Sequence, residues 1–141
     1  MKKITLIALF AVVATLFACK KDKAERNSDR LNGKWSLESM AYVYYEDGKE
    51  IEREQKSGLN LPWEFRTDGK ATVKIEGDTQ ETNWTATEST LEITSQGGDQ
   101  KLKFDIKSLS KTDLHLEYES DVDFENGKTY REVVEFKLKK K

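Results

Sequence analysis

The side chain with the clearest chemistry is the thiol of Cys19, the only cysteine in the 141-residue chain. A thiol is a nucleophile that can be acylated, and a small residue, Ala18, stands directly before it. Two lysines near the N-terminus and an apolar run over residues 4–18 precede the cysteine. This is the layout of a bacterial lipoprotein signal. The sequence therefore predicts a signal peptide over 1–18 and long acyl chains, such as palmitate, on Cys19.

The apolar run favours a cleaved signal over a transmembrane helix. It holds 15 residues, two of them threonines, whereas a spanning helix needs about 20 apolar residues. An ordinary secretory signal with an incidental cysteine is the alternative. One cysteine cannot form a disulfide within the chain. If it is lipidated, no free thiol remains for redox chemistry.

Other side chains give little support for catalysis. His115 is the only histidine and falls on the polar face of an expected strand. Asp121, Asp123 and Glu125 alternate in an expected loop, but their spacing is not that of an EF-hand calcium loop. No serine or threonine has a recognisable base and orienting group beside it. We predict no catalytic residue, no metal site and no cofactor, and a protein that is not an enzyme.

The segment that follows the signal predicts a flexible connection to the membrane. Residues 19–30 contain many charges and no large apolar side chain, so they cannot bury enough surface to offset their ordering entropy. We expect a lipidated flexible tether. Charges placed directly after the cysteine resemble surface-export signals of lipoproteins in the Bacteroidetes. The expected location is the cell envelope, with the outer membrane preferred and the surface and periplasmic faces both left open.

The charge balance gives no support for nucleic acid as a partner. Without the two lysines of the signal, the chain has 22 basic and 26 acidic residues. A mildly acidic surface of mixed sign gives no support for nucleic-acid binding. The expected partners are the membrane, through the acyl chains on Cys19, and a small apolar ligand or an envelope protein.

Beyond residue 33, apolar and polar residues alternate with a period of two, which is typical of antiparallel strands with one wet face. Turn signals such as Asp68-Gly69 and Asn126-Gly127 separate the runs. Eight short strands joined mostly by tight hairpins predict an all-β fold, an eight-stranded antiparallel up-and-down β-barrel over 31–141. A β-sandwich is the alternative, although it needs longer crossing connections. The apolar runs lie at residues 35–43, 63–65, 73–75, 84–86, 91–93, 102–106, 114–118 and 134–138.

The segment Glu46–Asn60 interrupts the alternation because it is long and polar. Part of it extends a first hairpin around Asp47-Gly48, with Ile51 returning toward the core. We expect the rest to form a mobile loop over the barrel mouth. The many inward apolar side chains predict a mostly packed interior with, at most, a shallow pocket near that mouth.

The order of these motifs resembles the lipocalin-like domain common in Bacteroidetes lipoproteins. Gly33 and Trp35 match the Gly-x-Trp motif of lipocalins at the start of the first strand, and the similarity extends over about residues 31–138. The resemblance implies a barrel in which Trp35 closes one end and a basic residue of the last strand, Arg131 or Lys139, packs across it. It names no ligand, because the family largely lacks an assigned activity.

Aromatic residues beside the expected loop are the candidates for binding: Tyr42, Tyr44, Tyr45 and Trp63. We expect Tyr45 to point inward and the other two tyrosines to lie on the opposite face. Cross-strand pairing that stabilises the sheet is the structural alternative. One hypothesis is a lipid-anchored binding protein that takes a small, partly apolar ligand at the mouth. The other is an interaction or inhibitor module with a packed barrel, directed at an envelope protein or at an enzyme such as a host lysozyme.

Overall fold

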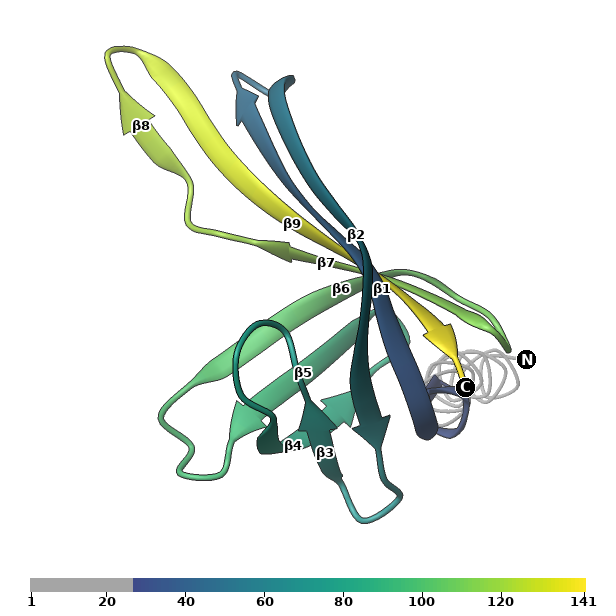
Figure 1. Ribbon diagram of the computed structural model, residues 1–141. Helices are drawn as coiled ribbons and strands as arrows, with labels where there is room; N and C mark the ends of the chain where they lie inside the picture. Colours follow the sequence, from purple (N-terminus) through teal and green to yellow (C-terminus); the bar gives the residue numbers. More distant parts are fainter. Residues whose placement is uncertain (1–26) are drawn as a thin grey trace, which may run out of the picture.

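A computed structural model describes residues 27–141, and its described part is built almost entirely from nine antiparallel strands (Figure 1). Hairpins join most of them. In chain order the strands are β1 Gly33–Glu46, β2 Lys49–Phe65, β3 Lys70–Val73, β4 Gln80–Ala86, β5 Thr90–Ser95, β6 Lys101–Leu109, β7 Asp113–Glu119, β8 Asp123–Glu125 and β9 Lys128–Lys140.

Eight of these strands form a closed barrel. Each strand from β1 to β7 pairs with its neighbour in sequence, and β9 pairs with both β7 and β1, which closes the ring. The short β8 pairs only with β9 and lies outside the ring. The predicted eight-stranded antiparallel up-and-down barrel is therefore confirmed. Closure leaves the ring without a free edge, apart from the parts of strands that extend beyond it.

The barrel interior is filled by side chains. Its largest fully buried members are Trp35, Trp63, Phe65 and Phe104, which come from β1, β2 and β6. The rings meet mostly edge to face, with centroids 6.1 Å apart for Trp63 and Phe65 and 5.4 Å apart for Phe104 and Phe136. Such geometry adds about 0.5–1.5 kcal/mol per pair beyond the burial of area. The interior is therefore mostly packed, as the alternation predicted, and a cavity remains at one end.

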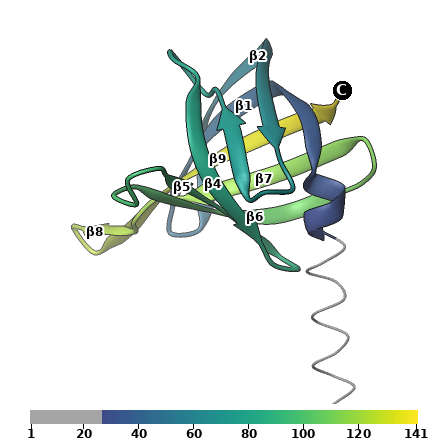
Figure 2. The same ribbon diagram turned by 90° about the horizontal axis from the view of Figure 1, so that it is seen from below.

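A short helical turn over residues 27–31 precedes β1 (Figure 2). The Asn27 side-chain amide donates to the carbonyl oxygens of Thr87 (3.2 Å) and Glu88 (2.8 Å). Leu31 inserts into the core and has no exposed surface. Four residues assigned to the tether, 27–30, thus lie in an ordered turn held against the β4–β5 connection. No helix among the described residues is long and apolar enough to span a membrane.

The predicted loop over Glu46–Asn60 is wrong. Most of that segment is the first part of β2, which pairs along β1 from Glu46↔Lys49 to Ser39↔Ser57. Together with β8 and the start of β9, this hairpin projects beyond the barrel (Figure 1). We call residues 44–52 and 120–132 the arm. Both faces of the arm meet water, so its residues show no period of two, and Ile51 is 56% exposed instead of returning to the core.

A β-bulge at Glu38 reverses the expected orientation of the tyrosines. Leu37 pairs with Leu138 and Ser39 with Lys137, so Glu38 has no partner on β9. The extra residue shifts the alternation by one position. Tyr42 therefore packs against the core cluster. Tyr45 lies on the outer face, where the Arg131 guanidinium stacks on its ring at 4.5 Å.

The closed end and the open mouth of the barrel

One end of the barrel is closed by the helical turn and the side chain of Trp35. The indole Nε1 of Trp35 donates to the carbonyl oxygen of Leu31 at 2.7 Å in a buried hydrogen bond. The turn is therefore fixed to the first strand by both an apolar and a polar contact. Trp35 and Leu31 are almost fully buried, and both belong to the core cluster of the barrel.

The basic residue across Trp35 is Lys140, and neither Arg131 nor Lys139 takes this place. The Lys140 ammonium lies 4.8 Å from the centre of the Trp35 ring and donates to the carbonyl oxygens of Arg30 (2.6 Å) and Asn32 (2.5 Å). Burial lowers the pKa of Lys140 from its usual value. The alternation of β9 explains the choice, because Lys140 is the direct cross-strand partner of Trp35.

Gly33 makes this packing possible. Its φ of +116° is disfavoured for residues with a side chain, and a Cβ added there would lie 3.3 Å from Lys140 Cε. The Gly-x-Trp motif therefore has a physical role. The glycine lets the chain turn into β1 and leaves room for the lysine stem, while the tryptophan supplies the ring.

The other end of the barrel is hollow. A cavity of about 500 Å³, open to solvent, lies where β3 and β5 end and β4 and β6 begin. Its wall includes the buried Phe104, whose ring also meets those of Trp63 and Phe136. The cavity is lined by Val73, Ile75, Gln80, Thr82, Ile93, Ser95, Asp99, Gln100, Lys101, Leu102 and Phe104.

The polar groups at this mouth are mostly neutral. Thr82 donates to the carbonyl oxygen of Ala71 (3.2 Å), and the Ser95 hydroxyl accepts from the backbone N–H of Gln100 (3.1 Å). The Lys101 ammonium is held by Glu92 at 2.9 Å, on the outer side of the strands. The mouth therefore offers apolar walls, hydroxyl and amide groups at the rim, and one carboxylate, Asp99.

None of the four predicted binding residues lines this cavity. Trp63 is buried beneath it, and its indole Nε1 donates to the Lys74 carbonyl oxygen at 2.7 Å. Tyr44 and Tyr45 line a smaller groove on the arm, while Tyr42 packs against the core cluster. The structure therefore does not bring the four together. Cys19 lies outside the described residues.

The remaining candidates for chemistry stay apart. His115 lies on β7 toward the outside, and its Nε2 is 4.0 Å from a carboxylate oxygen of Glu117. Within residues 27–141, no three His, Cys, Asp or Glu side chains come together in a way that could hold a metal ion. The acidic residues Asp121 and Asp123 line the groove on the arm.

The sequence predicted at most a shallow pocket at a mouth formed by Glu46–Asn60, and the actual lining of the cavity was missed because it comes from ordinary strand positions. Val73, Ile93 and Phe104 follow the same inward alternation as residues of the packed core. The available signal was the size of the inward side chains near the mouth, where Thr82 and Ser95 stand at positions that larger residues occupy elsewhere. Small polar residues at inward positions leave space that water or a ligand can fill.

A closed eight-stranded barrel that is plugged at one end and hollow at the other defines a class of small binding barrels. The chain belongs to the family described as the lipocalin-like domain, whose sequence model matches residues 31–116. The resemblance seen in the sequence is thus confirmed at the level of the domain. Neither a search of curated proteins nor a search of solved structures finds a match.

Proposed function

We propose that the protein binds a small, partly apolar ligand in the open mouth of the barrel, and that acyl chains on Cys19 hold it in the cell envelope. The observation that carries the proposal is the cavity of about 500 Å³ over the Phe104 wall. Ligand pockets in proteins are typically about 300–1,000 Å³, mostly apolar, with a few polar groups that orient the ligand. The mouth has this composition.

The chemistry of the lining limits the ligand. Valine, isoleucine, leucine and phenylalanine side chains favour an apolar body. The hydroxyl of Ser95 and the amides of Gln80 and Gln100 suit a neutral polar end, such as an alcohol, ester or amide. Asp99 is unfavourable for an anion. We therefore expect neutral amphiphiles to bind more tightly than fatty acids of the same length.

The proposed function is binding without catalysis. The lipocalin-like fold is typically a binding fold, and the mouth presents one carboxylate and one lysine, which is paired with Glu92. General acid–base catalysis needs a group within hydrogen-bond reach of the reacting atom and a suitable pKa. Asp99 is a single carboxylate, and the lining holds no second free acid or base to act with it.

The start of the described chain and the mouth lie at opposite ends of the domain. The helical turn at residues 27–31 lies at the closed end, and the cavity lies at the end where β3 finishes. If the chain is lipidated at Cys19, the membrane attachment precedes the closed end. The closed end would then be the end of the barrel tethered to the membrane, and the mouth would remain accessible to a ligand from the aqueous side. The outer membrane is the location we propose.

Native mass spectrometry of protein extracted from its own membrane tests the proposal, together with thermal unfolding across a panel of neutral and anionic amphiphiles. We expect a bound molecule of a few hundred daltons and a rise in melting temperature with neutral members of the panel. Recovery of bare protein only, with no ligand raising the melting temperature, would refute the binding function.

A further inference from the structure

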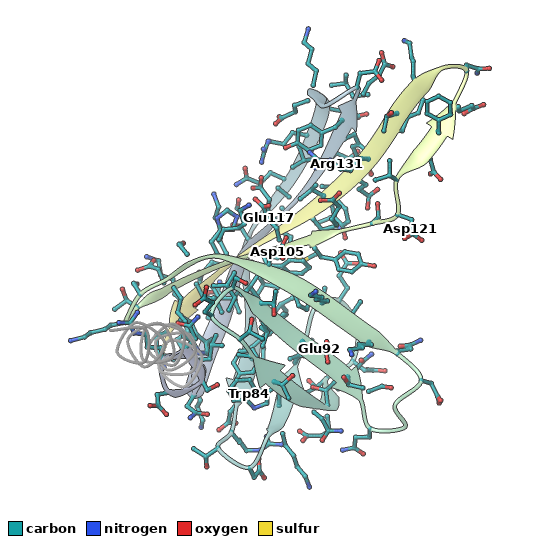
Figure 3. All side chains as sticks on the ribbon, turned by 180° about the vertical axis from the view of Figure 1, so that it is seen from behind. Trp84, Glu92, Asp105, Glu117, Asp121 and Arg131 are labelled. Atoms are coloured by element: carbon teal, nitrogen blue, oxygen red, sulfur yellow. The ribbon has the colours of Figure 1, made fainter. Side chains whose placement is uncertain are left out.

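The arm carries a second surface, separate from the barrel and its cavity. Its residues, 44–52 and 120–132, hold eight acidic and three basic side chains, a net charge of −5, whereas the whole chain has a net charge of −2. The charge of the molecule is therefore strongly asymmetric. Figure 3 shows the arm, with Asp121 and Arg131 labelled, well apart from Trp84 and Glu92 of the barrel.

A groove of about 290 Å³ lies on this arm. Three tyrosines, Tyr44, Tyr45 and Tyr130, supply aromatic surface, and Ile51 adds an exposed apolar side chain. The groove is near the lower limit of the volumes found for free small-molecule ligands, about 300 Å³. Its size suits a single inserted side chain of a larger partner. Its lining is completed by Glu52, Ser120, Asp121, Asp123, Arg131 and Glu132.

The carboxylates of the groove have no cationic partner within the described residues. Glu52, Asp121, Asp123 and Glu132 make none of the ion pairs found in residues 27–141. The one cation of the lining, Arg131, pairs with Glu119 at 3.4 Å and stacks on Tyr45. Four carboxylates line this small groove and make its potential negative, so a cation from outside would be attracted to it.

The tyrosines point to the same kind of ligand. Two tyrosines of β1 already hold cations of the chain itself: Lys56 lies 5.7 Å from the centre of the Tyr42 ring, and Arg131 lies 4.5 Å from that of Tyr45. In the described part of the chain, no such cation lies over Tyr44 or Tyr130. Burial, followed by the charge of Glu132, raises the pKa of the Tyr44 phenol, in keeping with a locally negative environment.

We propose that the groove of the arm binds a lysine or arginine side chain presented by a cationic partner protein. The cation would lie over Tyr44 and Tyr130 and among the carboxylates of Glu52 and Glu132. An ammonium or guanidinium group gains both from the ring quadrupole and from the charges around it. The arm extends from the end opposite the helical turn, which leaves it free to meet a partner (Figure 1).

Fluorescence anisotropy with fluorescein-labelled hexalysine tests this proposal on the full chain in detergent. A neutral glycine–serine hexapeptide with the same label is the reference probe. The double variant Glu52→Gln, Glu132→Gln removes two charges from the groove. Its matched control, Glu64→Gln with Glu88→Gln, removes two charges from the barrel and leaves the arm unchanged.

We expect the arm variant to weaken hexalysine binding about tenfold and the control to change it less than about twofold. A second pair of variants separates the contribution of the aromatic ring from that of the carboxylates. Tyr44→Leu should weaken hexalysine binding, and Tyr44→Phe should retain it. Equal loss in the arm variant and its control would show a long-range field without a site and would overturn the proposal. Equal binding of the lysine and glycine–serine peptides by the unmodified chain would do the same. Because ligands of the mouth are not involved, this result is independent of the proposed barrel function.

Discussion

The ammonium of Lys140 lies 4.8 Å above the ring of Trp35, and the two residues are cross-strand partners on β9 and β1. The contact joins the last strand of the barrel to the first at the point where the sheet closes. The same ammonium donates to Arg30 and Asn32, so it also holds the helical turn. The Lys140 side chain therefore links the strand pair that closes the barrel to the helical turn that covers one end of it.

Replacing Lys140 by methionine should destabilise the domain. The variant keeps an apolar stem over Trp35 but loses two hydrogen bonds to backbone carbonyls and the cation–π contact. We expect the free energy of unfolding in urea, followed by tryptophan fluorescence, to fall by about 1–3 kcal/mol. Lys139→Met is the control, because that lysine pairs with Asp113 on the exposed surface and should matter less. Equal effects of the two variants would argue against a special stabilising role of Lys140 at the closed end.

Replacing Gly33 by alanine should strain the start of β1. The new Cβ would sit at a φ of +116° and 3.3 Å from Lys140 Cε. We expect a loss of about 1–3 kcal/mol in the free energy of unfolding. Gly97→Ala adds a Cβ in an exposed turn without a positive φ, 3.1 Å from the carboxylate end of the exposed Asp99 side chain. That control should unfold like the unmodified chain; if Gly33→Ala does so too, the spatial argument for the motif is wrong.

The stability of the barrel should fall in acid partly through Glu81. Hydrogen bonds from the Thr72 hydroxyl and from Arg66 hold the pKa of this carboxyl below its usual value. The ionised form is favoured by folding, so its contribution is present above the unfolded pKa, about 4.3, and is lost as pH falls through the folded pKa. Urea unfolding of the Glu81→Gln variant from pH 7 to pH 3 checks this. The variant should be less stable at pH 7 and converge with the unmodified chain in acid, and a gap that is constant with pH would contradict the assignment.

Replacing Cys19 by serine should abolish lipidation. Without the thiol no acyl chains can be attached, and each buried methylene of such a chain contributes about 0.8 kcal/mol to membrane binding. Metabolic labelling with a palmitate analogue, followed by membrane fractionation, should show label and membrane association only for the chain with the cysteine. Labelling of the Cys19→Ser variant at an equal level would show that the acyl chains are not attached at Cys19.

The regular strands of the ring could be predicted from the sequence because each has one wet and one buried face. The runs around Ile93, Phe104 and Leu116 therefore show clean alternation and lie where it places them. The first part of β2 could not be found in this way. Both of its faces are solvated, so charged residues such as Glu52 and Arg53 follow one another without a period.

The tyrosines illustrate a second limit of prediction from the sequence. Their faces depend on one extra residue, Glu38, whose bulge has no distinctive sequence pattern and yet reverses the alternation for the rest of β1. The helical turn at 27–31 is too short for a helical period to be visible, and a single buried leucine, Leu31, was its only signal. The cavity at the mouth exists because small side chains, Thr82 and Ser95, stand at inward positions. A pattern of apolar residues does not reveal the volume that larger side chains would have filled.

The central claim is that the mouth of the barrel binds a small, partly apolar molecule, and a titration with the neutral fluorescent probe N-phenyl-1-naphthylamine tests it most directly. The Ile75→Trp variant would fill the cavity from its rim, and Val122→Trp places the same ring on an exposed loop away from it. We predict saturable binding with one probe per chain, lost in Ile75→Trp and retained in Val122→Trp. Equal binding by both variants, or no saturable binding by the unmodified chain, would contradict the claim.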